Sequence, residues 1–392
     1  MKMPKDLFFR LSFMMFLEFF VWGTWYVTTG VYLRKSLDFT GSEIGWVYSC
    51  SGIAAIIMPF IIGRLADKYF PIERLMAVLH SIAGAALLMA AQTNDFAHFF
   101  PWILLNALAY QPTMSLAISM SFYHQKEGMG QFPRIRLWGT TGWIVGGIIV
   151  SVMGWENVSM PLTLSGYVSF ALAAYCLTLP SAKPLGKNTG LRDVLQLVNN
   201  KALIYTLIAM VFIMVPASFY YSFVNPFLVE KGVNFPAAKM SYGQVSEIII
   251  LSVLPFIMKK LSWRKMITIG FFVWGARYLL FLLPNAQTEF HYNLALALHG
   301  IAFCFSALTA QIFVNHIARP EMKSTAQGAY SLVVMGIGSM LGNIIAGNVV
   351  DLASTPAGQI AWDYVWTFAG IFGISSAVIF FLTSAGRFNE HL

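Results

Sequence analysis

The amino-acid sequence predicts an all-α membrane protein with twelve transmembrane helices arranged in two six-helix bundles. Of the 392 residues, 57% are hydrophobic and only 11% are charged, whereas about a quarter of the residues of a soluble protein are charged. Apolar stretches also recur along the whole chain at about 20 residues, the length that a helix needs to cross a bilayer. The 11 Trp residues suit the membrane–water interfaces.

Six apolar stretches lie in each half of the chain. Those of the first half are 8–33, 43–66, 73–93, 99–123, 136–154 and 160–180. Those of the second half are 202–228, 240–258, 265–284, 290–318, 325–350 and 361–385. The first stretch is longer than the apolar core of a signal peptide, and no small-residue cleavage site follows it, so we interpret it as a retained span.

A polar segment, "LPSAKPLGKNTGLRDVLQLVNNK" (179–201), separates the two sets of spans. We therefore predict an N-terminal six-helix bundle over residues 1–180, a cytoplasmic linker over 181–201 and a C-terminal six-helix bundle over 202–392. Two repeated bundles of this kind place a binding site between them. A single helical bundle with one long loop is the alternative.

The net charge of +8 follows from where the basic residues lie. Most of the 25 Lys and Arg residues fall in loops that share one side of the membrane if the N-terminus is cytoplasmic, as the positive-inside rule requires. The excess of basic residues thus indicates the membrane topology, with both termini in the cytoplasm. We expect no nucleic-acid partner. Cys50, Cys176 and Cys304 are widely spaced, so neither a disulfide framework nor a metal site is expected.

Two local patterns concern helix starts and helix packing. Thr40 and Glu43 have the spacing of a capping box at the start of the second span. Small residues four apart allow helix backbones to approach closely in lipid. They occur in the fifth span of each half, as Gly142 with Gly146 and as Gly338 with Gly342.

Ionisable side chains within the spans are the strongest functional signal. Each costs about 3 kcal/mol near the middle of the bilayer and therefore usually faces a cavity or a partner. The candidates are Glu18, Arg136, Glu247, Arg277 and His299.

Helical spacing joins several of these residues to aromatic or polar neighbours on one face. The groups are Arg136 with Thr140 and Trp143, Ser218 with Tyr221 or Ser222 and with Asn225, Gln244 with Glu247, and His299 with Phe303 and Ser306. Aromatic walls with a few hydrogen-bonding groups suit a flat, polar, mostly uncharged ligand. Helix packing is the alternative for each stripe. For Arg136 the alternative is a charge that snorkels to the membrane surface. For Arg277 it is a cation that neutralises a buried carboxylate, and for His80 it is a core residue.

The segment "GRLADKYFPIERL" (63–75) resembles the loop between the second and third helices of the major facilitator superfamily. The resemblance implies close packing at Gly63 and a cytoplasmic gate formed by Asp67, Lys68 and Arg74. Phe70 departs from the glycine usual in that motif. The matching loop of the second half, "KKLSWRKM" (259–266), lacks the aspartate.

Over nearly its whole length the chain resembles the nucleoside:proton symporter family of that superfamily, a bacterial branch. The motifs are "EFFVWGTWYVTTGVYL" (18–33), "IGWVYSCSGIAAIIMPFIIGRLADKYF" (44–70), "AYQPTMSL" (109–116), "FPRIRLWGTTGW" (132–143), "GQVSEI" (243–248) and "TAQGAY" (325–330).

The resemblance implies a set of substrate-binding residues. Arg136, Thr140, Gln244 and Glu247 match family site residues; Trp143 represents an aromatic, and His299 and Phe303 fall on a tyrosine and a phenylalanine. The ribose would contact Gln244, Glu247 or Arg136, and the base would stack on Trp143 or Phe303. The chain departs from the better-known permeases at Cys304, where they have aspartate, and at Ser218 and Tyr221, where they have glutamine and asparagine.

The implied function is import of nucleosides coupled to protons by alternating access, in the bacterial inner membrane. We expect no cofactor, because the proton gradient supplies the energy and no Walker motif is present. The expected partners are a nucleoside, protons and the lipid bilayer, for a protein that acts as a monomer. Glu247 is the expected proton-coupling carboxylate and Glu18 the second candidate.

Three alternatives remain at this point. A permease for another small polar solute, such as a sugar, would have the same architecture. A sensor would bind solute without translocating it. An intramembrane enzyme is disfavoured, since neither H-E-x-x-H nor G-x-S-x-G occurs.

Overall fold

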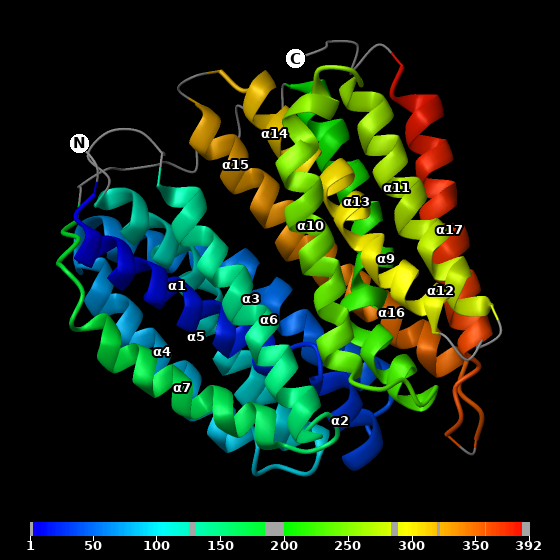
Figure 1. Ribbon diagram of the computed structural model, residues 1–392, viewed down its shortest axis with the longest axis horizontal. Helices are drawn as coiled ribbons and strands as arrows, with labels where there is room; N and C mark the ends of the chain where they lie inside the picture. The colour runs from blue at the N-terminus through cyan, green and yellow to red at the C-terminus, as the bar shows by residue number, and fades with distance from the viewer. Residues whose placement is uncertain are drawn as a thin grey trace. The chain divides into compact units, whose positions relative to one another are not determined.

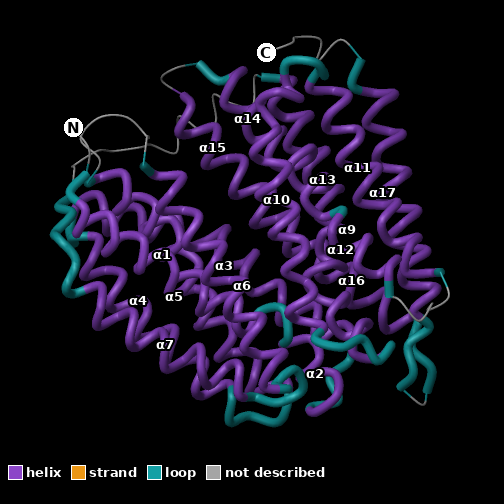
Figure 2. The backbone as a smooth tube through the Cα atoms, viewed as in Figure 1, coloured by secondary structure: helices purple, strands orange, loops and turns teal. Residues whose placement is uncertain are grey.

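A backbone surrounded by lipid must satisfy its own hydrogen bonds, so apolar segments of spanning length form helices. The computed structural model describes residues 3–124, 131–184, 200–283, 289–319, 322–356 and 358–385, and helices make up most of these residues (Figures 1 and 2). In chain order the α-helices are α1 (Lys5–Trp25), α2 (Thr29–Ser36), α3 (Gly41–Lys68), α4 (Ile72–Ala90), α5 (Phe96–Tyr123), α6 (Phe132–Met153), α7 (Met160–Cys176), α9 (Lys201–Glu230), α10 (Pro236–Met258), α11 (Trp263–Leu279), α12 (Phe290–Ala297), α13 (His299–Phe303), α14 (Thr309–Ile317), α15 (Lys323–Ser331), α16 (Ser339–Leu352) and α17 (Trp362–Thr383).

The helices confirm the predicted spans. Within the described ranges, ten helical stretches are at least 18 residues long and apolar enough to cross a membrane. Two further helices are α7, which has 17 residues, and α5, which has 28 residues and contains Pro101 and Pro112. With these two, every predicted span has a helix at its position.

Contacts between Cα atoms divide the chain into two compact units. The first is Met1–Phe39, Ile53–Asn188 and Asn234–Ala238, and the second is Thr40–Gly52, Thr189–Val233 and Lys239–Leu392. The first part of α3 therefore belongs to the second unit. The bundle limits predicted from the sequence stay a prediction, and residues 185–199 of the predicted linker lie outside the described residues.

In the first unit, α1 packs on α6 and α7, and α4 packs on α5 and α7. The contact of α1 with α6 is close because Gly142 has no side chain. A Cβ atom at Gly142 would lie 2.1 Å from the Phe16 carbonyl oxygen, which confirms the close approach predicted from the glycine spacing.

In the second unit, α9 packs on α16 and α17, and α11 packs on α17. Gly342 on α16 lies against α9, where a Cβ atom would be 2.5 Å from the Ser218 hydroxyl oxygen. The start of α3 also packs in this unit, because both Asp351 carboxylate oxygens accept hydrogen bonds from its backbone, from the Gly41 and Ser42 N–H groups.

Two predicted details have clear outcomes. The capping box is confirmed: the Thr40 N–H donates to Glu43 Oε2 at 2.8 Å, and the Glu43 N–H donates to Thr40 Oγ1 at 3.2 Å. The expected close packing at Gly63 is wrong for the described residues, because none of them would lie within 4 Å of a Cβ atom there. Gly63 lies near the C-terminal end of α3.

Candidate functional site

In the first unit, α6 carries three predicted site residues on successive turns. The Arg136 guanidinium carbon lies 4.1 Å from the centre of the Phe19 ring, a cation–π distance. The buried Trp143 ring meets Trp22 edge-on, with 4.8 Å between ring centres. Thr140, which lies between Arg136 and Trp143 in the sequence, is half-buried. The tight α1–α6 packing thus fixes an aromatic and cationic stripe at this helix.

In the second unit, α9 presents buried polar groups that lack partners. Asn225 is 0% exposed and Ser218 is 2% exposed. Among the described residues, neither amide atom of Asn225 nor the Ser218 hydroxyl has a hydrogen-bond partner. Such groups are costly to bury unless water or a ligand satisfies them. Tyr221, between them on the helix, places its ring edge-on to His299 at 5.9 Å.

Gln244 and Glu247 lie one turn apart on α10, both half-buried. The Gln244 Oε1 atom is buried and has no hydrogen-bond partner in the described part of the chain. Helix α10 is held against α13 because the Gly300 N–H donates to the Ser246 hydroxyl at 2.9 Å, and a Cβ atom at Gly300 would lie 2.4 Å from the Ser246 backbone. Glu247 is therefore held beside the helix that carries His299.

His299 is at the centre of an aromatic cluster. Its ring stacks on Tyr220 with 4.6 Å between centres and an 18° interplanar angle. It also lies parallel to Phe303 at 6.0 Å and edge-on to Trp274 at 5.4 Å. Phe303 is followed by the π-helical turn Cys304–Leu308, a local irregularity common at functional sites.

Arg277 determines which nitrogen of His299 carries the proton. Its Nη1 atom lies 3.2 Å from His299 Nδ1. A guanidinium only donates hydrogen bonds, so Nδ1 accepts and the proton of the neutral ring is on Nε2. His299 therefore offers an N–H donor at Nε2, a role that the sequence did not reveal.

Arg277 packs against aromatic rings, and its predicted role of neutralising a buried carboxylate stays a prediction. Arg277 is fully buried, and its guanidinium carbon lies 4.2 Å from the centre of the Tyr220 ring and 5.3 Å from that of Trp274. Aromatic faces therefore lie beside this buried cation. This arrangement is possible because a guanidinium is weakly hydrated and stacks on rings.

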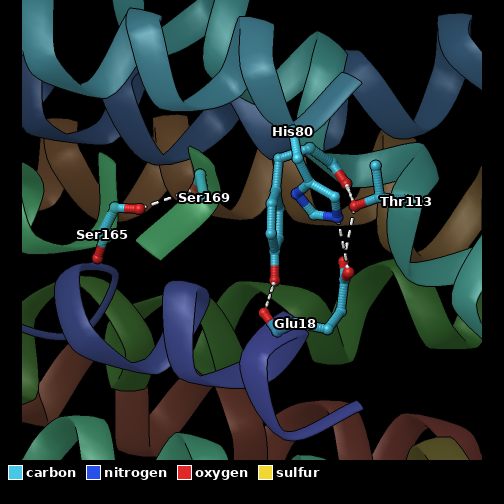
Figure 3. A network of polar contacts seen from close by, with 6 residues as sticks. Glu18, His80, Thr113, Ser165 and Ser169 are labelled. Carbon is cyan, nitrogen blue, oxygen red and sulfur yellow. Dashed lines mark hydrogen bonds and ion pairs between the residues drawn. The ribbon is translucent and has the colours of Figure 1, made fainter. Parts of the chain in front are cut away.

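Glu18, the second candidate for proton coupling, lies in a buried polar network of the first unit (Figure 3). Its Oε2 atom is 2.9 Å from His80 Nε2, and both side chains are 0% exposed. Its Oε1 atom is 2.6 Å from the Thr113 hydroxyl. His80 is a buried residue, as expected, but its pairing with Glu18 was not predicted. The sequence shows Glu18, His80 and Thr113 within three apolar spans, but it does not indicate that they meet.

The predicted gate residues lie at the end of α3 and the start of α4. Asp67 is half-buried, whereas Lys68 and Arg74 are exposed. Beside them, the Glu73 carboxylate accepts a hydrogen bond from the Ala182 N–H at 3.0 Å, which ties the start of α4 to the chain after α7. The gate itself stays a prediction.

Helices of spanning length at every predicted position, with polar and aromatic side chains buried inside them, are typical of a multi-pass membrane transporter. The sequence profile of the nucleoside H⁺ symporter family matches residues 5–387. The chain belongs to this family.

Individual relatives agree with this assignment. The chain is 33% identical to the xanthosine permease of Escherichia coli K12, over 95% of this chain and 94% of the permease. It is 32% identical to the nucleoside permease NupG of the same organism, over 92% of each. A crystal structure of the nucleoside transporter NupG superimposes with a TM-score of 0.88 at 30% identity, covering 96% of this chain and 98% of that one.

Proposed function

We propose that this chain imports nucleosides together with protons across the bacterial inner membrane by alternating access. The membership of the nucleoside H⁺ symporter family over residues 5–387 supports it. The observation that carries it is the cluster on α9, α10 and α13. There, the rings of Tyr220, His299 and Phe303 stack. Beside Gly243, which packs on His299, the buried Gln244 Oε1 atom has no hydrogen-bond partner among the described residues.

The chemistry of this cluster suits the two parts of a nucleoside. A base is flat and apolar on its faces, so it stacks on aromatic rings such as Phe303. The ribose hydroxyls both donate and accept, so they pair with the amides of Asn225 and Gln244 and with Glu247. The Nε2–H of His299 suits an acceptor on the edge of the base. Arg136, Thr140 and Trp143 of the first unit stay proposed substrate contacts.

Glu247 is the proposed proton-coupling carboxylate. It is half-buried on an apolar helix, one turn from Gln244. Removing a carboxylate from water disfavours its charged form. A carboxyl group therefore takes up a proton when it loses contact with water and releases the proton when water returns. The proton gradient is the proposed energy source. The cytoplasmic placement of both termini follows from the distribution of basic residues.

Uptake into proteoliposomes tests this function. Labelled nucleosides should accumulate when an inward proton gradient is imposed, and unlabelled sugars should not compete. Accumulation above the external concentration would also exclude a sensor that only binds. Competition by a sugar but by no nucleoside would refute the substrate assignment.

Glu247→Gln should lower gradient-driven accumulation, because it removes a coupled proton. The matched control is Glu43→Gln, which removes a carboxylate from a helix start and keeps a capping-box residue. If Glu247→Gln accumulates nucleoside as the wild type does, Glu247 does not couple the proton.

A further inference from the structure

The Glu18–His80 pair is a second candidate for proton chemistry, separate from the cluster that contains Glu247. Glu18 is on α1 and His80 is on α4, and both side chains are 0% exposed. Figure 3 shows them with Thr113 of α5, and the Tyr110 hydroxyl, also on α5, donates to the Glu18 backbone carbonyl. A buried carboxylate with only a neutral partner is costly, so the protonation state of this network has to be derived from its hydrogen bonds.

The hydrogen atoms around Thr113 indicate a protonated carboxyl group. The Thr113 hydroxyl oxygen lies 2.6 Å from Glu18 Oε1 and 2.6 Å from the Tyr110 carbonyl oxygen. A hydroxyl has one hydrogen to donate, and a carbonyl oxygen only accepts. One Thr113 hydrogen can be shared by two acceptors, but each of these two short contacts has a hydrogen of its own when Glu18 is protonated. The Thr113 hydrogen then goes to the Tyr110 carbonyl, and Glu18 Oε1 donates to the Thr113 hydroxyl oxygen.

The second carboxyl oxygen fits a neutral His80. With the proton on Oε1, Oε2 accepts the Nε2–H of His80 at 2.9 Å. His80 Nδ1 is then a bare lone pair, and it has no hydrogen-bond partner among the described residues. An imidazolium would instead bury an N–H donor at that position without a partner. The network is thus uncharged and holds one proton more than a carboxylate with a neutral imidazole.

Other helices bring titratable or charged groups close to this pair. They are Tyr110 on α5, Arg136 on α6, Cys176 on α7 and Glu73 on α4. The Tyr110 hydroxyl donates to the Glu18 backbone carbonyl, and Glu73 is held by a backbone N–H. Arg136 is the cation in this set, and it lies close enough to Tyr110 to act on it electrostatically. It would stabilise Glu18 once the proton has left.

We propose that the Glu18–His80 pair is a second proton-binding site of the transport cycle, occupied in this conformation. When water reaches Glu18, the proton on Oε1 leaves to that water and the carboxylate remains. The Thr113 hydroxyl then turns from the Tyr110 carbonyl to the carboxylate. This inference rests on the proposed function, proton-coupled nucleoside import. The proton that Glu18 releases in each transport cycle adds to the proton coupled through Glu247.

The bound proton is measurable without transport. Infrared difference spectra of the reconstituted protein at neutral pH, wild type minus Glu18→Gln, should show loss of a carboxylic acid C=O band. Glu73→Gln is the matched control, since it removes a buried carboxylate with a backbone partner and should leave that band in place. Loss of a carboxylate band in Glu18→Gln, in place of the acid band, would show that Glu18 is ionised and would overturn the proposal.

The transport experiment measures whether this proton moves. A gradient of one pH unit drives about tenfold accumulation for each coupled proton. Accumulation by Glu18→Gln should fall by about tenfold, while exchange of internal for external nucleoside without a gradient continues. Unchanged accumulation would refute a role for Glu18 in the cycle. Complete loss of gradient-driven accumulation in Glu18→Gln would mean that every coupled proton depends on Glu18. That result would keep Glu18 as a proton site and refute the assignment of proton coupling to Glu247.

A second pair of variants guards against misfolding of Glu18→Gln. Thr113→Ser keeps the hydroxyl and should behave as wild type, whereas Thr113→Val should shift the pH profile of uptake. Equal pH profiles for the two variants would overturn the hydrogen-bond argument. If the wild type shows no gradient-driven uptake of any nucleoside, the proposed function fails, and the infrared band still decides whether Glu18 holds a proton.

Discussion

The close packing of α1 on α6 predicts that Gly142→Ala destabilises the first unit. A Cβ atom at Gly142 would lie 2.1 Å from the Phe16 carbonyl oxygen and 3.0 Å from the carbonyl carbon. Both are backbone atoms, so no side chain can rotate away and the two helices have to separate. Overpacking of this kind costs about 1–3 kcal/mol.

The matched control is Gly63→Ala, because a Cβ atom there meets nothing within 4 Å. Gly63 lies inside α3, where replacing glycine by alanine stabilises a helix by up to about 1 kcal/mol. Both variants replace a glycine by alanine, but Gly142→Ala should lower the stability, whereas Gly63→Ala should leave it unchanged or raise it.

The assay is thermal unfolding in detergent, followed by loss of helical circular dichroism. For a unit of this size, about 1–3 kcal/mol corresponds to a decrease in Tm of roughly 2–12 °C. Gly63→Ala should leave Tm unchanged or raise it. Because Arg136 and Trp143 are carried by α6, nucleoside uptake should fall only in Gly142→Ala. Equal Tm values for the two variants would refute the steric argument.

Two further predictions concern the second unit. Arg277→Met removes the donor to His299 Nδ1 and should raise the KM for nucleoside about two- to tenfold, the equivalent of one hydrogen bond, whereas Tm should hold or rise because a buried cation is lost. An unchanged KM would show that the tautomer of His299 does not matter. Asp351→Asn removes the charge that caps α3 at Gly41 and should lower the unfolding free energy by about 1–2 kcal/mol in denaturant titrations. The exposed Asp363→Asn is the control, and equal losses in the two variants would contradict the capping role.

Composition and periodicity alone determined the fold class and the positions of the helices. Apolar stretches such as 43–66 and 160–180 became α3 (Gly41–Lys68) and α7 (Met160–Cys176). These properties are local: a bilayer-length apolar run has no way to satisfy its backbone in lipid except as a helix. The capping box of Thr40 and Glu43 was predictable for the same reason, since all its atoms lie within four residues.

Helical spacing also predicted part of the candidate site. It placed Gln244 and Glu247 one turn apart, and the structure has both half-buried on α10. Family resemblance added the substrate class, and the family match over residues 5–387 confirms it at the level of the family. The residue-by-residue roles stay predictions.

Only the tertiary structure determined the partners of the buried charges. Residue spacing predicts which side chains share a helix face. It does not predict which helix packs against that face, because the packing depends on where the helix backbones approach closely. Thus Glu18 meets His80 and Thr113 from two other helices, and Arg277 meets the Tyr220 ring and His299. The protonation of Glu18 and the tautomer of His299 follow from these contacts, since each is fixed by a hydrogen-bond partner distant in sequence.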